Sequence, residues 1–196
     1  MEKTKTKIPK LADIYQESGN LEEAFKNDMW LHLLSQKPPE SWVREHPYAK
    51  DDKGKPIKYL PIDKVEYLLK KIFKRYRIEV VSYAPLFNSV TCHVRVHYIN
   101  PVNGEWDHQD GVGAAGVQVD KGSRASDMSA IKKEAVMMAL PSAKSYAIKD
   151  ALENLGEIFG ANLNRKDAIG YVPDEEIISR EEKRRQKLIQ HGIEIQ

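Results

Sequence analysis

The chain of 196 residues lacks the features that mark secreted, membrane-spanning or metal-clustered proteins. It contains one cysteine, Cys92, so an intrachain disulfide and a cysteine metal cluster are excluded, and we expect Cys92 to be a buried strand residue. No apolar run approaches the roughly 18 residues that cross a bilayer, and the lysine-rich beginning shows no signal-peptide pattern. We therefore expect a soluble, cytoplasmic protein without a membrane partner.

Motifs for nucleotide chemistry are missing or stand in the wrong context. No G-x-x-x-x-G-K-[ST] loop occurs, so nothing indicates an ATP site. Residues 111–116, GVGAAG, match G-x-G-x-x-G, but an alternating run follows where the dinucleotide fingerprint requires the start of a helix. We interpret the segment as a glycine-rich strand that bends or lets another backbone approach closely, and we expect no cofactor.

Charge is unevenly distributed along a chain whose net charge is only +2. Nine basic and two acidic residues lie within positions 53–77, which gives this segment a net charge of +7. A local positive field attracts polyanions even when the whole chain is close to neutral. The segment indicates either a surface for an anionic partner such as nucleic acid, or a solvated helix face.

The hydrophobic pattern predicts helices on both sides of an antiparallel meander. Residues 61–76 place apolar side chains on one arc of a helix and basic ones on the other. The period then changes to two over three stretches, with turns near 85–89 and 100–104. A helical stretch follows at 128–140, and a second one begins at Pro141 and runs to about Asn162. This order is typical of an α+β fold.

Composition divides the chain into three parts. Residues 10–36 show helical periodicity, which is interrupted at 19–20 and ended by Pro38 and Pro39. This pattern predicts an N-terminal segment, 1–37, with two short helices. Residues 38–170 hold the mixed pattern and form the predicted core domain. Residues 171–196 mix charges of both signs and lack a broad apolar face, so we expect a charged tail that is either a loose helix or disordered.

Candidate metal ligands are weakly indicated. His93 and His97 lie four apart, but strand alternation separates them by about 13 Å along one polar face, so we expect no shared metal. Acidic residues near the second turn of the meander suit magnesium by chemistry, but their spacing alone is weak evidence and an exposed acidic hairpin explains them better. A metal-dependent nuclease therefore remains as an alternative, with these carboxylates as its candidates: Glu105, Asp107, Asp110 and Glu134.

Two glycines stand out in the last predicted helix. Gly156 and Gly160 lie beside an apolar helix face, and a glycine inside a helix costs about 1 kcal/mol relative to alanine. We therefore expect a sheet, a neighbouring subunit or a nucleic-acid backbone to pack closely against them.

Three separated blocks now point to a family. The chain contains PPESWVREHP at 38–47, KYLPIDKVEYLLKKIF at 58–73 and PSAKSYAIKDALENLGEIFGANLNRKD at 141–167, with a D-G-V-G strand between the last two. In this order they resemble the phage Sak-type single-strand annealing proteins, in the superfamily of the eukaryotic Rad-fifty-two recombination protein. The resemblance covers about Pro38 to Asp167.

The resemblance implies both an architecture and an activity. It implies a Rad-fifty-two-like core, in which an antiparallel meander packs on a long helix, and homo-oligomers that form a ring or a helical filament. It further implies ATP-independent binding of single-stranded DNA and annealing of complementary strands, without covalent chemistry, in phage recombination and DNA repair. The expected partners are single-stranded DNA, a phage exonuclease and a single-strand-binding protein in the cytoplasm of a bacterial host.

Basic residues are carried over from the family's DNA groove. This sequence departs from the eukaryotic pattern at Asp150, Glu153 and Asn154, where basic residues would be expected. The inner DNA contacts that the resemblance implies are Lys55, Lys58, Lys132, Lys133, Lys144, Lys149, Arg165 and Lys166. An outer site is expected at Arg95, Lys121 and Arg124. A non-catalytic scaffold, whose charged tail recruits a single-strand-binding protein, is a further alternative.

Overall fold

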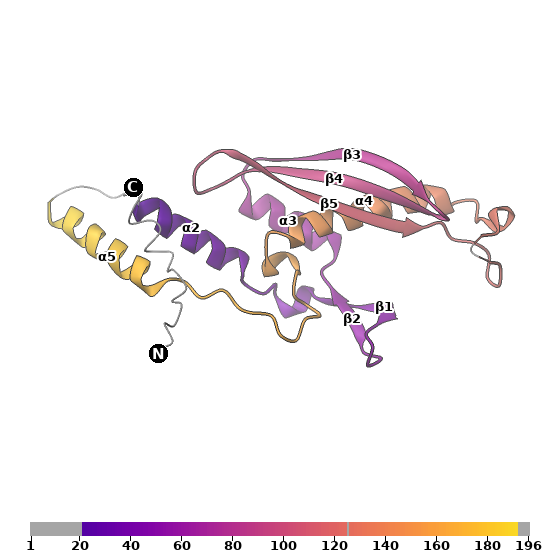
Figure 1. Ribbon diagram of the computed structural model, residues 1–196, viewed down its shortest axis with the longest axis horizontal. Helices are drawn as coiled ribbons and strands as arrows, with labels where there is room; N and C mark the ends of the chain where they lie inside the picture. Colours follow the sequence, from indigo (N-terminus) through magenta and orange to yellow (C-terminus); the bar gives the residue numbers. More distant parts are fainter. Residues whose placement is uncertain (1–20, 125, 192–196) are drawn as a thin grey trace, which may run out of the picture. The chain divides into compact units, whose positions relative to one another are not determined.

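The computed structural model describes residues 21–124 and 126–191, which group into two compact units (Figure 1). One unit is the continuous segment 36–168. The other consists of the described parts of the two chain ends, up to residue 35 and from residue 169 onward. The helix predicted before residue 19 lies outside the described residues.

A three-stranded antiparallel sheet forms the centre of the 36–168 unit. Its strands are β3 (Tyr76–Leu86), β4 (Ser89–Ile99) and β5 (Trp106–Gly116), in the order β3-β4-β5. Side chains of β4 alternate, since those of Cys92, Val94, Val96 and Tyr98 are buried and the intervening ones are partly exposed. The predicted meander and the buried cysteine are therefore confirmed, and GVGAAG lies within strand β5, as predicted.

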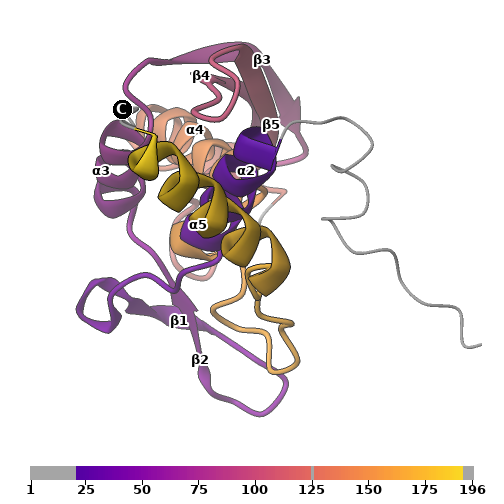
Figure 2. The same ribbon diagram turned by 90° about the vertical axis from the view of Figure 1, so that its left-hand side faces the viewer.

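Two helices, α3 (Ile62–Ile72) and α4 (Ala135–Glu153), cover one face of this sheet, as Figure 1 and Figure 2 show. Helix α3 buries Val65, Leu68 and Leu69 and exposes its lysines at 70 and 71, as its amphipathic pattern predicts. Phe73 follows the helix and packs on Tyr98, with the ring centroids 4.5 Å apart. The α+β class with antiparallel sheets is thus confirmed.

Close contact between α4 and β5 depends on residues without large side chains. A Cβ atom at Gly111 would lie 2.2 Å from the carbonyl oxygen of Ala147, and one at Gly113 would lie 2.4 Å from that of Ala143. Every fourth residue along the buried side of α4 is an alanine, at positions 135, 139, 143, 147 and 151. The glycine-rich strand therefore lets the helix backbone approach, as the sequence indicates.

The extent of α4 corrects the sequence-based prediction. Pro141 does not open a second helix but lies inside α4, on its exposed side, where water can replace the backbone hydrogen bond that proline cannot donate. The helix ends at Glu153 rather than near Asn162. Gly156 and Gly160 therefore flank a short 3-10 helix, η3 (Glu157–Phe159), instead of lying within a helix, and Gly160 has a left-handed φ of 104°.

A second, two-stranded sheet precedes α3. Strands β1 (Arg44–Lys50) and β2 (Pro56–Tyr59) form an antiparallel hairpin with an irregular register. The short helix η1 (Glu40–Trp42) lies before it, and Trp42 contacts the ring of Tyr67 on α3 edge to face at 5.7 Å. A further short helix, η2 (Met128–Ala130), precedes α4.

The terminal unit is a pair of helices, α2 (Leu21–Leu34) and α5 (Glu175–Gln190). Ala24 and Ile177 form its buried apolar centre. Asp28 is fully buried and accepts hydrogen bonds from the Tyr171 hydroxyl and from the backbone N–H of Asp174. Most of the sequence predicted as a loose helix or disordered tail thus forms a helix that packs on α2.

The turn between β3 and β4 offers a test of backbone strain. Phe87 has a left-handed φ of 51° and is 97% exposed. Because this conformation costs a non-glycine residue about 1 kcal/mol while asparagine tolerates it, Phe87→Asn is expected to raise the free energy of unfolding by about 1 kcal/mol. Urea unfolding followed by circular dichroism measures this change. Leu86→Asn, on an exposed neighbour with ordinary φ, is the control, and an equal gain there would contradict the explanation.

Candidate nucleic-acid interface

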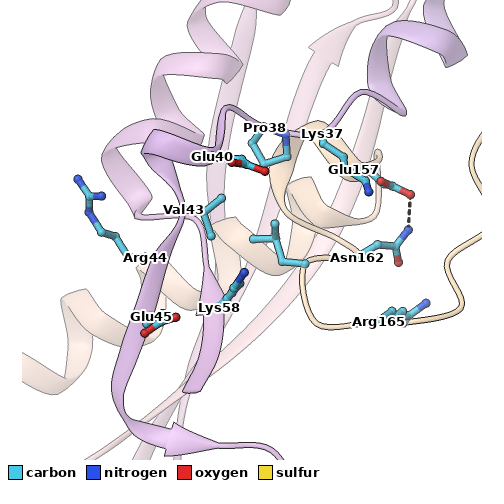
Figure 3. Close-up of a pocket in the computed structure, with 11 residues that line it drawn as sticks. Lys37, Pro38, Glu40, Val43, Arg44, Glu45, Lys58, Glu157, Asn162 and Arg165 are labelled. Carbon is cyan, nitrogen blue, oxygen red and sulfur yellow. Dashed lines mark hydrogen bonds between the residues drawn. The ribbon is translucent and has the colours of Figure 1, made fainter. Parts of the chain in front are cut away.

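A cavity of about 570 Å³ opens between the β1–β2 hairpin and the turn after η3 (Figure 3). It lies entirely within the 36–168 unit. Two residues of the predicted inner DNA site, Lys58 and Arg165, line it from positions more than 100 residues apart in sequence. The full lining is Lys37, Pro38, Glu40, Val43, Arg44, Glu45, Lys58, Glu157, Asn162, Leu163 and Arg165.

Amide side chains position the walls of this cavity. The side-chain oxygen of Asn164 accepts a hydrogen bond from the backbone N–H of Lys58 at 2.7 Å, and its amide nitrogen donates to the Lys58 carbonyl at 2.7 Å. Asn162 donates to Glu157 at 2.9 Å, which braces the turn (Figure 3). Strand β2 and the turn that carries Arg165 are therefore fixed together, and sequence reasoning missed Asn164.

The cavity carries both signs of charge. Four basic side chains line it together with three carboxylates, those of Glu40, Glu45 and Glu157. The guanidinium of Arg44 donates to the carbonyl of Ser41 at 3.1 Å, and Figure 3 shows this side chain pointing away from the other labelled ones. A polyanion would therefore meet mainly Lys58, Arg165 and Lys37, with the carboxylates limiting how many phosphates fit.

The other predicted inner residues are spread over the same unit. Lys149 lies on α4 next to the hairpin, because its ammonium nitrogen is 4.8 Å from the centre of the Tyr59 ring on β2. Burial lowers the pKa of Lys149, and burial raises the pKa of the neighbouring Glu153. The remaining predicted residues do not line the cavity: Lys55 in the hairpin turn, Lys132 and Lys133 before α4, Lys144 on α4, and Lys166 beyond Arg165.

Asp150 and Asn154, two positions where basic residues were expected, form hydrogen bonds with the backbone of β5. The Asp150 carboxylate accepts a hydrogen bond from the backbone N–H of Val112 at 2.9 Å. The Asn154 amide donates to the carbonyl of Asp110 at 3.3 Å. Both bonds tie the edge strand β5 to α4, so these positions serve the fold where basic residues were expected.

The three residues of the predicted outer site lie in different surroundings: Arg95 is on strand β4, whereas Lys121 and Arg124 are in a loop. The Arg95 guanidinium donates two hydrogen bonds to Asp110, at 2.6 and 2.8 Å, and His93 lies 3.3 Å from the same carboxylate. Arg95 first and His93 second hold the pKa of Asp110 well below its usual range. The charge of Arg95 is therefore matched on the sheet, whereas Lys121 and Arg124 are exposed in the loop before η2.

The candidate metal ligands are engaged elsewhere or dispersed. Asp110 is paired with Arg95, and Asp107 accepts a hydrogen bond from the Tyr98 hydroxyl at 3.2 Å. Burial, followed by the charge of Asp107, raises the pKa of Tyr98 to about 12. Within residues 21–124 and 126–191, no group of three histidine, cysteine or acidic side chains is placed to hold a metal ion.

The described residues thus form an α+β fold with two antiparallel sheets. In the 36–168 unit, the first cavity brings together basic residues from distant parts of the sequence. No protein-family model matches the chain, and no curated protein sequence matches it. Among the described helices, none combines the length and apolar character that crossing a bilayer requires.

Proposed function

We propose that the protein binds single-stranded DNA and anneals complementary strands without ATP. The observation that carries this proposal is the joint placement of Lys58 and Arg165 in one cavity, held by the Asn164 amide. The helix–meander–helix order of the 36–168 unit supports the resemblance to the Rad-fifty-two-like annealing core.

The mechanism requires binding and orientation but no covalent step. Lysine and arginine contacts to phosphates give an affinity that is independent of sequence and falls with salt. A strand held by its backbone keeps its base edges free for pairing with a complementary strand. In this proposal the protein acts as a homo-oligomer on single strands that an exonuclease exposes, alongside a single-strand-binding protein, during phage recombination in a bacterial cytoplasm.

The test is the annealing of two complementary oligonucleotides, one fluorescent and one carrying a quencher, with EDTA present and ATP absent. The protein is expected to accelerate quenching, and the acceleration is expected to fade as salt rises, because counterions compete for the phosphates. Without acceleration at any salt concentration, the proposal fails. Magnesium-dependent loss of labelled strand would instead support the nuclease alternative, with Asp107→Asn as the diagnostic variant.

A further inference from the structure

A second cavity of about 540 Å³ lies within the 36–168 unit, apart from the residues that line the first. Two aromatic residues line it, His46 on β1 and Tyr146 on α4. The rest of its lining is Ala114, Ala115, Gly116, Gln118 and Ser142.

These two rings belong to a connected series of ring contacts. The ring of His46 lies 6.0 Å from that of Tyr59, and the Lys149 ammonium nitrogen lies 4.8 Å from the centre of the Tyr59 ring. The same ammonium lies 5.9 Å from the centre of the Tyr146 ring. On the hairpin side the series continues to Tyr48, whose ring is 6.4 Å from that of His46. The hairpin and α4 thus present aromatic surfaces joined by a cation.

Exposure distinguishes these rings from core aromatics. Tyr48 is 88% exposed and Tyr146 is 48% exposed, so neither ring is used to fill the interior. The wall contributed by β5 consists of small residues, and a Cβ atom at Gly116 would meet no atom within 4 Å. The cavity is therefore open on its β5 side, at Gly116.

Two polar side chains also line the cavity, those of His46 and Gln118. The Nδ1 atom of His46 accepts hydrogen bonds from the backbone N–H groups of Tyr48 and Ala49, at 3.2 and 2.9 Å. This arrangement leaves the ring proton on Nε2. Gln118 adds an amide that can both donate and accept.

We propose that this cavity is a stacking site for bases of a bound single strand, with Tyr146 as its main platform. The inference rests on the proposed function and adds a contact to the bases that phosphate binding alone does not include. Every base has a π face, so stacking strengthens binding without reading sequence, and base–aromatic stacking changes affinity by roughly tenfold per base. Lys149, between two of the rings, contributes its charge beside the stacked base.

The experiment compares an oligothymidine with an abasic deoxyribose-phosphate strand of the same length and charge, at one salt concentration. The full chain is expected to bind the oligothymidine roughly tenfold more tightly. Tyr146→Ala is expected to abolish this preference while leaving affinity for the abasic strand unchanged. Tyr146→Phe, which keeps the ring, is expected to retain the preference. Tyr83→Ala is the matched control, since Tyr83 is 45% exposed on β3, outside the ring series.

The possible results separate this inference from the proposed function. If the full chain binds both strands equally, the stacking site is wrong while phosphate binding stands. If it binds neither strand, the proposed function fails and the stacking site fails with it. Should Tyr146→Ala weaken both strands equally, with an unchanged circular dichroism spectrum, Tyr146 only positions Lys149 and the inference is overturned.

Discussion

Gly111→Ala is expected to destabilise the 36–168 unit by about 3 kcal/mol or more, enough to unfold it at moderate urea concentration. The new methyl group would lie 2.2 Å from the carbonyl oxygen of Ala147 and 2.3 Å from the backbone nitrogen of Ala151. Both atoms belong to the backbone of α4, so no side-chain rotation relieves the overlap. The helix would have to move away from β5 and lose its packing on the sheet.

Urea unfolding followed by circular dichroism measures this effect. Gly116→Ala is the matched control, because Gly116 ends the same strand and a Cβ atom there meets nothing within 4 Å. We expect the control to change the free energy of unfolding by less than about 0.5 kcal/mol. Equal effects at the two positions would show that the approach of α4 to β5 is not what requires glycine at 111.

The double substitution Lys58→Glu with Arg165→Glu is expected to weaken single-strand binding about 100-fold near 0.1 M salt. Each phosphate contact contributes about fivefold at this salt concentration, given a slope of about 0.7 for single strands. Loss of two contacts therefore accounts for about 25-fold, and repulsion between the new carboxylates and phosphate supplies the rest. The slope of log affinity against log salt concentration is also expected to become shallower, because two fewer phosphate contacts are made.

A fluorescence anisotropy titration across a salt series measures both quantities. Lys71→Glu with Lys74→Glu is the control, since it changes the net charge equally at exposed positions at and just beyond the end of α3. These lysines belong to the part of the basic segment 53–77 that does not line the cavity. If the control loses as much affinity as the cavity variant, the loss follows net charge rather than the placement of Lys58 and Arg165, and the cavity is not the binding site.

Local patterns in the sequence were sufficient for the central sheet and for α3. Alternation in β4 predicted which side chains face the core, because the pleat of a strand places successive side chains on opposite faces. The arc of Val65, Leu68 and Leu69 predicted the buried side of α3 for the equivalent reason in a helix. The glycines at 111 and 113 indicated a close approach, although not to which helix.

Features that depend on tertiary contacts could not be predicted from local sequence patterns. The β1–β2 hairpin includes Pro47 and few β-formers, and contacts such as the one between Tyr59 and Lys149 join it to α4. Pro141 looked like a helix start, yet packing of alanines on both sides of it keeps the helix continuous. Asn164 gave no local signal at all, because its partner is the backbone of a residue 106 positions away.

The pairing of α2 with α5 has a consequence for synthesis on the ribosome. The segment 36–168 contains all strands of both described sheets, so it can fold as soon as it has left the exit tunnel. Helix α2 emerges earlier, but its partner α5 is translated about 140 residues later. The contact between Ala24 and Ile177 therefore cannot form until after the intervening unit has been synthesised. During that interval the face of α2 that later packs on α5 is accessible to chaperones, and a stalled ribosome would leave α2 unpaired.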